Sequence, residues 1–330
     1  MSIVTQQSEA PAPGRSAPAR REWPGRRGGR PGGRRAGRRG RWLPYLLLLP
    51  ATVAVFVTLL YPVGSMVGLS FQRENLADLV ARRTTWVGLD NYGNVLTDEF
   101  FWTVLPRTLA FAAVCVVLTL VIGTACALLL HRADRWARVF LSVCLVVTWA
   151  TPVIIGAAVF RWLFDTEFGV VNYVLTATGV CDCRQQSWLG DPVGAFVVLV
   201  TIVVWGAVPF AAMSIYAGLL TVPPELTEAA RVDGASGRRV FVSIVFPLLR
   251  PIYAILTVLS VIWDTKVFPQ VWLTTKGGPY QGTVMLGVYI YNKGINNSQF
   301  GVASTVAVLM TLMLVGLSWL YIRTLRGEIR

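Results

Sequence analysis

The residue types that perform acid–base or nucleophilic catalysis are scarce in this sequence. The chain has a single histidine, His131, which stands beside Arg132 at the end of an apolar segment. Its three lysines, Lys266, Lys276 and Lys293, lie outside any G-x-x-x-x-G-K-S/T sequence of the kind that cradles nucleotide phosphates. No Ser/His/Asp set, paired-carboxylate site or metal site can be assembled. We therefore expect that this chain hydrolyses no ATP and binds no cofactor or metal ion.

A polar stretch at residues 223–251 carries the densest group of functional candidates. Pro223 and Pro224 suit the first turn of a helix, and Glu228 lies near its positively polarised end. Gly234 can adopt the positive φ angle that ends a helix. The residues around this turn are small, so the backbone of another protein could approach closely: Ala229, Ala230, Gly234, Ala235, Ser236 and Gly237. We expect a short surface helix, a tight turn and a second helix.

Long apolar segments must position this stretch. The 330 residues are 54% hydrophobic, which is too apolar for a soluble domain. Six segments are long enough to cross a bilayer, namely residues 42–71, 108–130, 139–164, 193–216, 252–273 and 301–321. The first and third are overlong and could tilt or continue as surface helix. The sequence predicts an all-α integral membrane protein with six transmembrane helices.

The charges between the segments predict the orientation of the chain. Arginines gather in the loops after the second and fourth segments and at the C-terminus: Arg132, Arg135, Arg138, Arg231, Arg238, Arg239, Arg323, Arg326 and Arg330. Acidic residues gather in the loops after the first and third segments, although Arg73, Arg82 and Arg83 also lie in the first of these. Because cytoplasmic loops are enriched in Lys and Arg, we expect both termini in the cytoplasm.

Residues 1–41 differ in composition from the rest of the chain. They hold eleven arginines but only two acidic residues, Glu9 and Glu22, and few large apolar side chains. This composition predicts a disordered cytoplasmic tail that contacts anionic lipid, followed by a six-helix domain at residues 42–330. The apolar stretch from Trp42 is too long for the core of a signal peptide.

The five cysteines fall into two groups. Cys115, Cys126 and Cys144 lie in apolar segments and behave as small hydrophobic residues. Cys181 and Cys183 lie in a loop expected to face an oxidising compartment. They could form a disulfide or bind metal, and since no histidine is nearby we expect the disulfide.

The polar stretch resembles the coupling loop of ABC importer permeases. Its pattern E-A-A-x-x-D-G-A is matched by Glu228, Ala229, Ala230, Asp233, Gly234 and Ala235, and is followed by Phe241, Ile244, Pro247 and Pro251. The segments WVGLDNYGNVL, FGVVNYVL and LTTKGGPYQGT, the last with Gly277, Gly278 and Pro279, are similar to successive landmarks of carbohydrate-uptake permeases of the maltose-permease-like type. The resemblance covers about residues 42–326. Arg107, where the family usually has Asn, and the Arg-rich tail depart from it.

The resemblance implies a mechanism and a set of partners. A cytoplasmic ABC ATPase dimer, which holds the ATP and Mg, would close on ATP and drive alternating access through the coupling loop at residues 222–251. Glu228 would transmit force by pairing with a basic residue of the ATPase, whereas Asp233 would either join this contact or cap the second helix or pair with Arg231. A second related permease and an extracytoplasmic sugar-binding protein would complete the assembly in a bacterial cytoplasmic membrane.

The resemblance also implies a path for sugar through the spans. Aromatic rings against the C–H face of a sugar and polar groups for its hydroxyls could come from Trp205, Trp263, Gln270 and Trp272. Asp264 and Lys266 are ionisable residues at membrane depth, which are costly unless they face water or each other. Two interpretations stay open: these residues line the substrate path, or Asp264 and Lys266 pair near the outer interface and the tryptophans form an aromatic belt.

Three alternative functions compete with sugar import. The same architecture could import another polar solute, such as a glycerophosphodiester or a polyamine. A membrane-anchored nucleic-acid-binding protein could act through the Arg-rich tail. An ion-coupled secondary transporter is the third alternative, but the halves show no evident inverted repeat and the coupling loop would be unexplained.

Overall fold

The computed structural model describes residues 43–328, so the predicted tail at residues 1–41 lies outside the described part of the chain. The chain divides into two compact units, one up to Phe56 and one from Val57 onward. In the first unit the described residues form helix α1 (Leu43–Val55) and the start of a π-helical turn, Phe56–Leu60. The second unit contains the remaining elements, and the fold described below is that of this unit.

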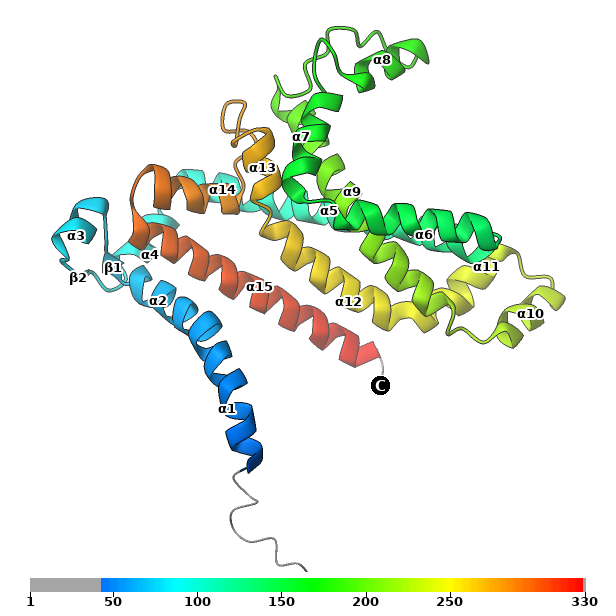
Figure 1. Ribbon diagram of the computed structural model, residues 1–330, viewed down its shortest axis with the longest axis horizontal. Helices are drawn as coiled ribbons and strands as arrows, with labels where there is room; N and C mark the ends of the chain where they lie inside the picture. The colour runs from blue at the N-terminus through cyan, green and yellow to red at the C-terminus, as the bar shows by residue number, and fades with distance from the viewer. Residues whose placement is uncertain (1–42, 329–330) are drawn as a thin grey trace, which may run out of the picture. The chain divides into compact units, whose positions relative to one another are not determined.

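The second unit is almost entirely helical, apart from one short hairpin (Figure 1). Its elements in chain order are α2 (Tyr61–Ser70), β1 (Gln72–Arg73), α3 (Leu76–Ala81), β2 (Thr85–Trp86), α4 (Asp90–Leu96), α5 (Glu99–Arg132), α6 (Arg135–Ala150), α7 (Val153–Leu163), α8 (Val170–Ala177), α9 (Pro192–Leu219), α10 (Pro224–Val232), α11 (Gly237–Val240), the π-helical η3 (Phe241–Val245), α12 (Phe246–Thr265), α13 (Pro269–Thr274), α14 (Leu286–Tyr291), the π-helical η4 (Asn292–Asn296) and α15 (Phe300–Glu328).

Five continuous helical stretches within the described residues are long and apolar enough to cross a membrane. They are Tyr45–Ser70, Glu99–Arg132, Pro192–Leu219, Gly237–Thr265 and Phe300–Arg323. Each contains most of one predicted apolar segment. The third predicted segment is not a single straight helix, because α6 and α7 meet at a bend of 102°. Thr151 is extended, with ψ of 125°, since a residue before proline disfavours the helical conformation and Pro152 has no amide proton to continue α6.

The helices of the second unit pack around α5 and α9, which run side by side (Figure 1). Gly123 of α5 allows this close approach, because a Cβ atom there would lie 2.9 Å from the Cβ of Ala211 on α9. Helix α12 lies against both, α6 lies against α9, and α15 packs against α2. Three proline residues lie inside these long helices: Pro106 in α5, Pro209 in α9 and Pro251 in α12.

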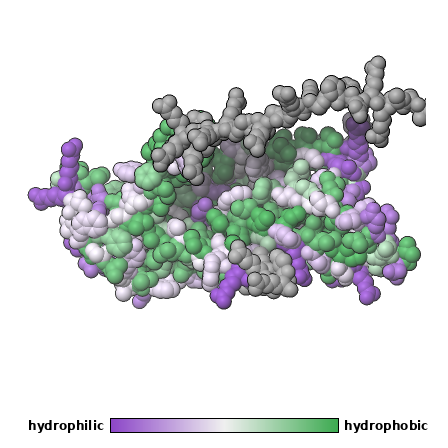
Figure 2. Space-filling view, turned by 90° about the horizontal axis from the view of Figure 1, so that it is seen from below, coloured by the Kyte–Doolittle hydropathy of each residue, from purple (hydrophilic) through white to green (hydrophobic). Residues whose placement is uncertain are grey.

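The surface of these helices is apolar where a soluble protein would be polar. On α6, for example, Phe140, Val143 and Val147 are all exposed. Figure 2 shows hydrophobic residues over much of the visible face and hydrophilic residues gathered toward its ends. Exposed hydrophobic side chains on helices of this length are typical of contact with lipid.

Asn91, in the G-L-D-N-Y element of the segment WVGLDNYGNVL, ties the first loop to the helices. Its Nδ2 donates hydrogen bonds to the carbonyl oxygens of Ser70 (3.0 Å) and Gln72 (2.9 Å). Thr305 of α15 also donates to the Ser70 carbonyl, at 3.1 Å. Gly301 must be glycine for this packing, because a Cβ atom there would collide with the Gln72 carbonyl oxygen. The element therefore fixes the end of α2 against the start of α15.

Candidate functional site

The predicted coupling loop forms a helix, a tight turn and a second helix. Helix α10 ends at Gly234, whose φ of +81° is the positive value predicted from the sequence. The Ala235 amide donates to the Ala230 carbonyl (2.9 Å) and the Gly234 amide to the Arg231 carbonyl (3.0 Å). This pair of bonds is a Schellman motif, in which glycine supplies the left-handed residue.

The small residues of the loop have two different roles. Ala230 and Ala235 are half-buried and pack against a cluster of buried residues from α5, α9, α11, η3 and α12, namely Ala127, Ala211, Ile215, Leu219, Val240, Val245, Leu249 and Leu256. Glu228 and Ala229 are exposed. The loop thus presents one surface to solvent and fastens the other to three long helices.

Asp233 does not cap the second helix. Ser236 is the N-cap of α11, and its Oγ accepts a hydrogen bond from the Arg239 amide at 3.4 Å. Asp233 lies at the C-terminal cap of α10, is exposed, and forms no ion pair with Arg231 in the described part of the chain. The capping and pairing interpretations of Asp233 are therefore wrong, and its carboxylate is free to meet a partner.

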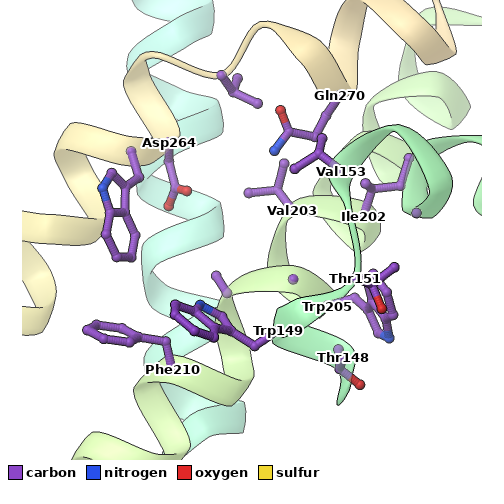
Figure 3. Close-up of a pocket in the computed structure, with 15 residues that line it drawn as sticks. Thr148, Trp149, Thr151, Val153, Ile202, Val203, Trp205, Phe210, Asp264 and Gln270 are labelled. Carbon is purple, nitrogen blue, oxygen red and sulfur yellow. The ribbon is translucent and has the colours of Figure 1, made fainter. Parts of the chain in front are cut away.

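A cavity of about 260 Å³ lies between α9, α12, α13 and the bend that joins α6 to α7. Its lining includes four of the six residues predicted for the substrate path: Trp205, Trp263, Asp264 and Gln270. The cavity is also lined by four residues that were not predicted, Thr148, Trp149, Thr151 and Phe210 (Figure 3). An aromatic residue in an apolar segment gives no sign of which side of the helix it faces.

Three aromatic rings of this cavity, those of Trp149, Phe210 and Trp263, form a connected group. Phe210 contacts Trp149 with centroids 6.4 Å apart and an interplanar angle of 22°, and contacts Trp263 at 5.3 Å and 61°. Trp205 packs against Phe160 of α7 at 5.2 Å. Flat aromatic surfaces beside polar groups suit a ligand that has both apolar and polar faces.

Two polar side chains in the cavity hold atoms without a hydrogen-bond partner in the described part of the chain. Asp264 is 4% exposed and its Oδ2 is unpartnered, as is Oε1 of Gln270. Buried polar atoms normally have a hydrogen-bond partner. Two unpartnered atoms at a cavity wall therefore indicate a place where a ligand or water molecule could bind.

Lys266 and Trp272 lie elsewhere. Lys266 is exposed, and it forms no ion pair with Asp264 among the described residues. The predicted alternative in which these two charges neutralise each other is therefore wrong. Trp272 packs against Phe268 and Tyr291, with centroids 5.9 Å and 4.4 Å away.

The Gly-Gly-Pro loop is held in shape by hydrogen bonds. Gly277 has a φ of +91°, and a Cβ atom there would lie 2.7 Å from Cγ2 of Val284. The Thr283 hydroxyl donates to the Gly278 carbonyl at 2.6 Å and lies 2.7 Å from the Thr275 hydroxyl. These contacts give the loop a defined conformation that extends beyond a single turn.

Asp98 joins the start of α5 to α14 and η4. Its Oδ2 accepts hydrogen bonds from the Tyr289 hydroxyl (2.6 Å) and the Lys293 ammonium (3.0 Å), and its Oδ1 accepts from the Phe100 amide (2.9 Å). Burial by itself raises the pKa of Asp98, but these donors outweigh burial and hold the pKa below its usual range. Nothing in the sequence indicates this cluster.

Apolar helices, an exposed helical turn fastened to them and a cavity between them define a membrane permease, and comparison with known proteins agrees. The model of the family described as "binding-protein-dependent transport system inner membrane component" matches residues 119–324. The chain is 44% identical over 284 residues to a diacetylchitobiose uptake system permease protein of Streptomyces coelicolor, covering 86% of this chain and 87% of that protein. It is 31% identical over 281 residues to a trehalose/maltose transport system permease protein of Thermococcus litoralis, covering 85% and 92%.

A solved structure supports the fold. A chain from a bacterial ABC transporter involved in the import of alginate superposes with a TM-score of 0.76 at 20% identity, covering 88% of this chain and 98% of that chain. This chain therefore belongs to the family of binding-protein-dependent transport system inner membrane components. The family resemblance predicted from the coupling loop is confirmed.

Proposed function

We propose that this chain is a permease subunit of a binding-protein-dependent ABC transporter that imports a mono- or oligosaccharide across a bacterial cytoplasmic membrane. The sugar assignment is supported by the two relatives named above, whose names specify diacetylchitobiose and trehalose/maltose uptake. In this proposal the chain crosses the membrane six times, with the bent pair α6 and α7 as one crossing and both termini in the cytoplasm. Residues 1–41 form a cytoplasmic tail, and residues 42–330 form the permease domain.

The observation that carries the proposal is the connection between α10 and the cavity. Ala230 and Ala235 fasten α10 to a cluster that includes residues of α9 and α12. The same two helices supply Trp205, Phe210, Trp263 and Asp264 to the cavity wall. A force applied to the exposed side of α10 would therefore reach the helices that line the cavity.

This connection suits ATP-driven alternating access. A separate cytoplasmic ATPase dimer binds ATP and Mg and docks on the exposed side of α10, where Glu228 pairs with a basic residue of the ATPase. Ala229 and Gly234 are exposed and small, which leaves room for a close approach, and the carboxylate of Asp233 is free to meet the partner. A second related permease forms the other half of the pathway, and a sugar-binding protein docks on the outer loops, which include Gly277, Gly278 and Pro279. The chain itself binds no cofactor.

The test is ATPase activity of the reconstituted complex, stimulated by the binding protein loaded with mono- or oligosaccharides. We expect one saccharide to stimulate the wild-type complex, and Glu228→Ala to abolish most of that stimulation at equal subunit assembly. Glu225→Ala is the matched control, because Glu225 is also an exposed glutamate of α10. Equal stimulation in both variants would refute the role of Glu228, and stimulation by a polyamine or glycerophosphodiester alone would refute sugar import.

A further inference from the structure

The cavity wall contains one carboxyl group that the protein leaves unsatisfied. Asp264 projects from α12 into the cavity, on the side of the Trp149 and Phe210 rings (Figure 3). It is 4% exposed, and its Oδ2 has no partner in the described part of the chain. A purely structural role for Asp264 does not explain why Oδ2 lacks a partner. A buried carboxylate that stabilises the fold would accept hydrogen bonds from its neighbours.

The residues that face Asp264 bring no compensating charge. The lining from α6, the bend, α7, α9 and α13 consists of apolar, aromatic, threonine and glutamine residues, with no lysine or arginine. Lys266, the nearest cation along the chain, is exposed and unpaired with Asp264. Gln270 is uncharged and offers both a donor and an acceptor. The charge of the cavity lining is therefore set by Asp264.

A buried carboxylate without a partner is unfavourable until a ligand supplies donors. Sugar hydroxyls, amide N–H groups and ammonium groups all donate hydrogen bonds, and an ammonium group can also lie against the aromatic wall. A sugar carboxylate or sulfate would instead bring a second negative charge into a space with few compensating donors.

We infer that Asp264 makes this permease select sugars by charge, favouring neutral and amino sugars over acidic ones. This inference rests on the proposed sugar transport and adds the chemical class of the sugar. It concerns the cavity of this chain and is separate from any selection that the binding protein makes.

The experiment measures sugar binding to the detergent-solubilised complex without its binding protein, so that the cavity alone is probed. Saturation-transfer NMR titrations would compare three disaccharides of similar size: diacetylchitobiose, which is neutral, chitobiose, which carries ammonium groups, and cellobiouronic acid, which carries a carboxylate. In the wild type we expect the uronate to bind about tenfold or more weakly than the neutral sugar, a ratio appropriate to one charge-assisted contact.

Asp264→Asn keeps the size of the side chain and removes its charge. We expect this variant to bind the neutral and acidic sugars within about threefold of each other and to lose about tenfold in affinity for chitobiose. Asp264→Glu, which keeps the charge, should bind the three disaccharides in the same order of affinity as the wild type. Asp182→Asn is the matched control, because it removes a carboxylate whose side chain is 86% exposed and lies outside the cavity lining.

Two results would overturn the inference in different ways. If wild type and Asp264→Asn bind the three sugars in the same order, the charge selection by Asp264 is wrong while sugar transport stands. If neither protein binds any saccharide, although the assembled complex retains ATPase activity that depends on Glu228, then the sugar assignment and the inference both fail.

Discussion

Arg107 donates a hydrogen bond from Nη1 to the carbonyl oxygen of Gln281, at 2.7 Å and 174 residues away in the chain. The same nitrogen donates to the Val284 carbonyl at 3.2 Å. One side chain of α5 therefore holds the closing half of the Gly-Gly-Pro loop. This arginine stands where the family usually has asparagine, and nothing in the sequence links it to the loop.

Removing Arg107 should loosen that loop without unfolding the helices. Arg107→Ala loses two hydrogen bonds from a charged group, a loss of about 1.5 to 3 kcal/mol in local stability. Hydrogen exchange should become faster at the Thr283 amide, which donates to the Gly277 carbonyl at 3.2 Å. The Leu286 amide, which donates to Thr108 at 3.0 Å, is the internal control and should stay protected. Unchanged exchange at Thr283 would contradict this role.

Coupling should depend on Gly234 in the turn after α10 but not on the nearby Gly237. Gly234→Ala places a Cβ atom on a residue with φ of +81°, which costs about 1 to 2 kcal/mol for an L-residue. Gly237→Ala meets no atom within 4 Å and has no positive φ angle, so it serves as the control. We expect only Gly234→Ala to lower binding-protein-stimulated ATPase activity. Equal activity of the two variants would show that the Schellman turn is not needed for coupling.

The contact between α5 and α9 should depend on Gly123. Gly123→Val would force the helices apart, because even a Cβ atom lies 2.9 Å from the Cβ of Ala211, and overpacking of this kind costs about 1 to 3 kcal/mol. Gly206→Val is a matched control in the middle of α9, where a Cβ atom meets nothing within 4 Å. Thermal denaturation of the purified complex should show a lower midpoint for Gly123→Val alone, and similar midpoints would refute the close packing.

The ion pair between Asp98 and Lys293 should make the stability of the folded protein depend on pH in the acidic range. Because the folded-state pKa of Asp98 lies below its ordinary 3.8, the ionised form contributes stability above that value, and the contribution is lost as the pH falls through the folded-state pKa. The two side chains are each 25% exposed, so we expect a coupling of about 1 kcal/mol.

A double-mutant cycle with Asp98→Asn and Lys293→Met measures that coupling. It should be present at neutral pH and should decrease in acid, as the pH falls through the folded-state pKa of Asp98. Tyr289, whose pKa is raised by burial and by the neighbouring Asp98, stays protonated as a donor throughout this range. A coupling that is the same at neutral and acidic pH would mean that the Asp98 carboxylate charge is not what stabilises the pair.

The sequence was sufficient where a local rule applied. Gly234 ends α10 because a turn of this type needs a positive φ angle, and long apolar runs predicted the helices that contain Thr108 and Trp205. The bend at Pro152 could have been predicted, since proline ends a helix at the preceding residue, but the segment was interpreted from its hydrophobicity alone. The pairing of Asp264 with Lys266 could also have been rejected, because residues two apart on a helix do not face each other.

Contacts between distant segments could not be predicted from one sequence. Nothing near Arg107 indicates Gln281, and nothing near Asp98 indicates Lys293. The cavity also depends on contacts between distant segments, because Trp149 and Phe210 face each other only when α6 packs on α9. A hydrophobic segment of a membrane protein is apolar on every side, so its sequence does not show which face lines a cavity.

Pro209 interrupts the main-chain hydrogen bonding of α9 beside the cavity. Because proline has no amide proton, the main-chain carbonyl of Trp205, four residues earlier, lacks the helical donor that would normally engage it. Trp205, Gly206, Ala207 and Phe210 all line the cavity. The missing donor is a property of the backbone, so replacing the Trp205 side chain would not change it, and only a residue with an amide proton at position 209 could supply it.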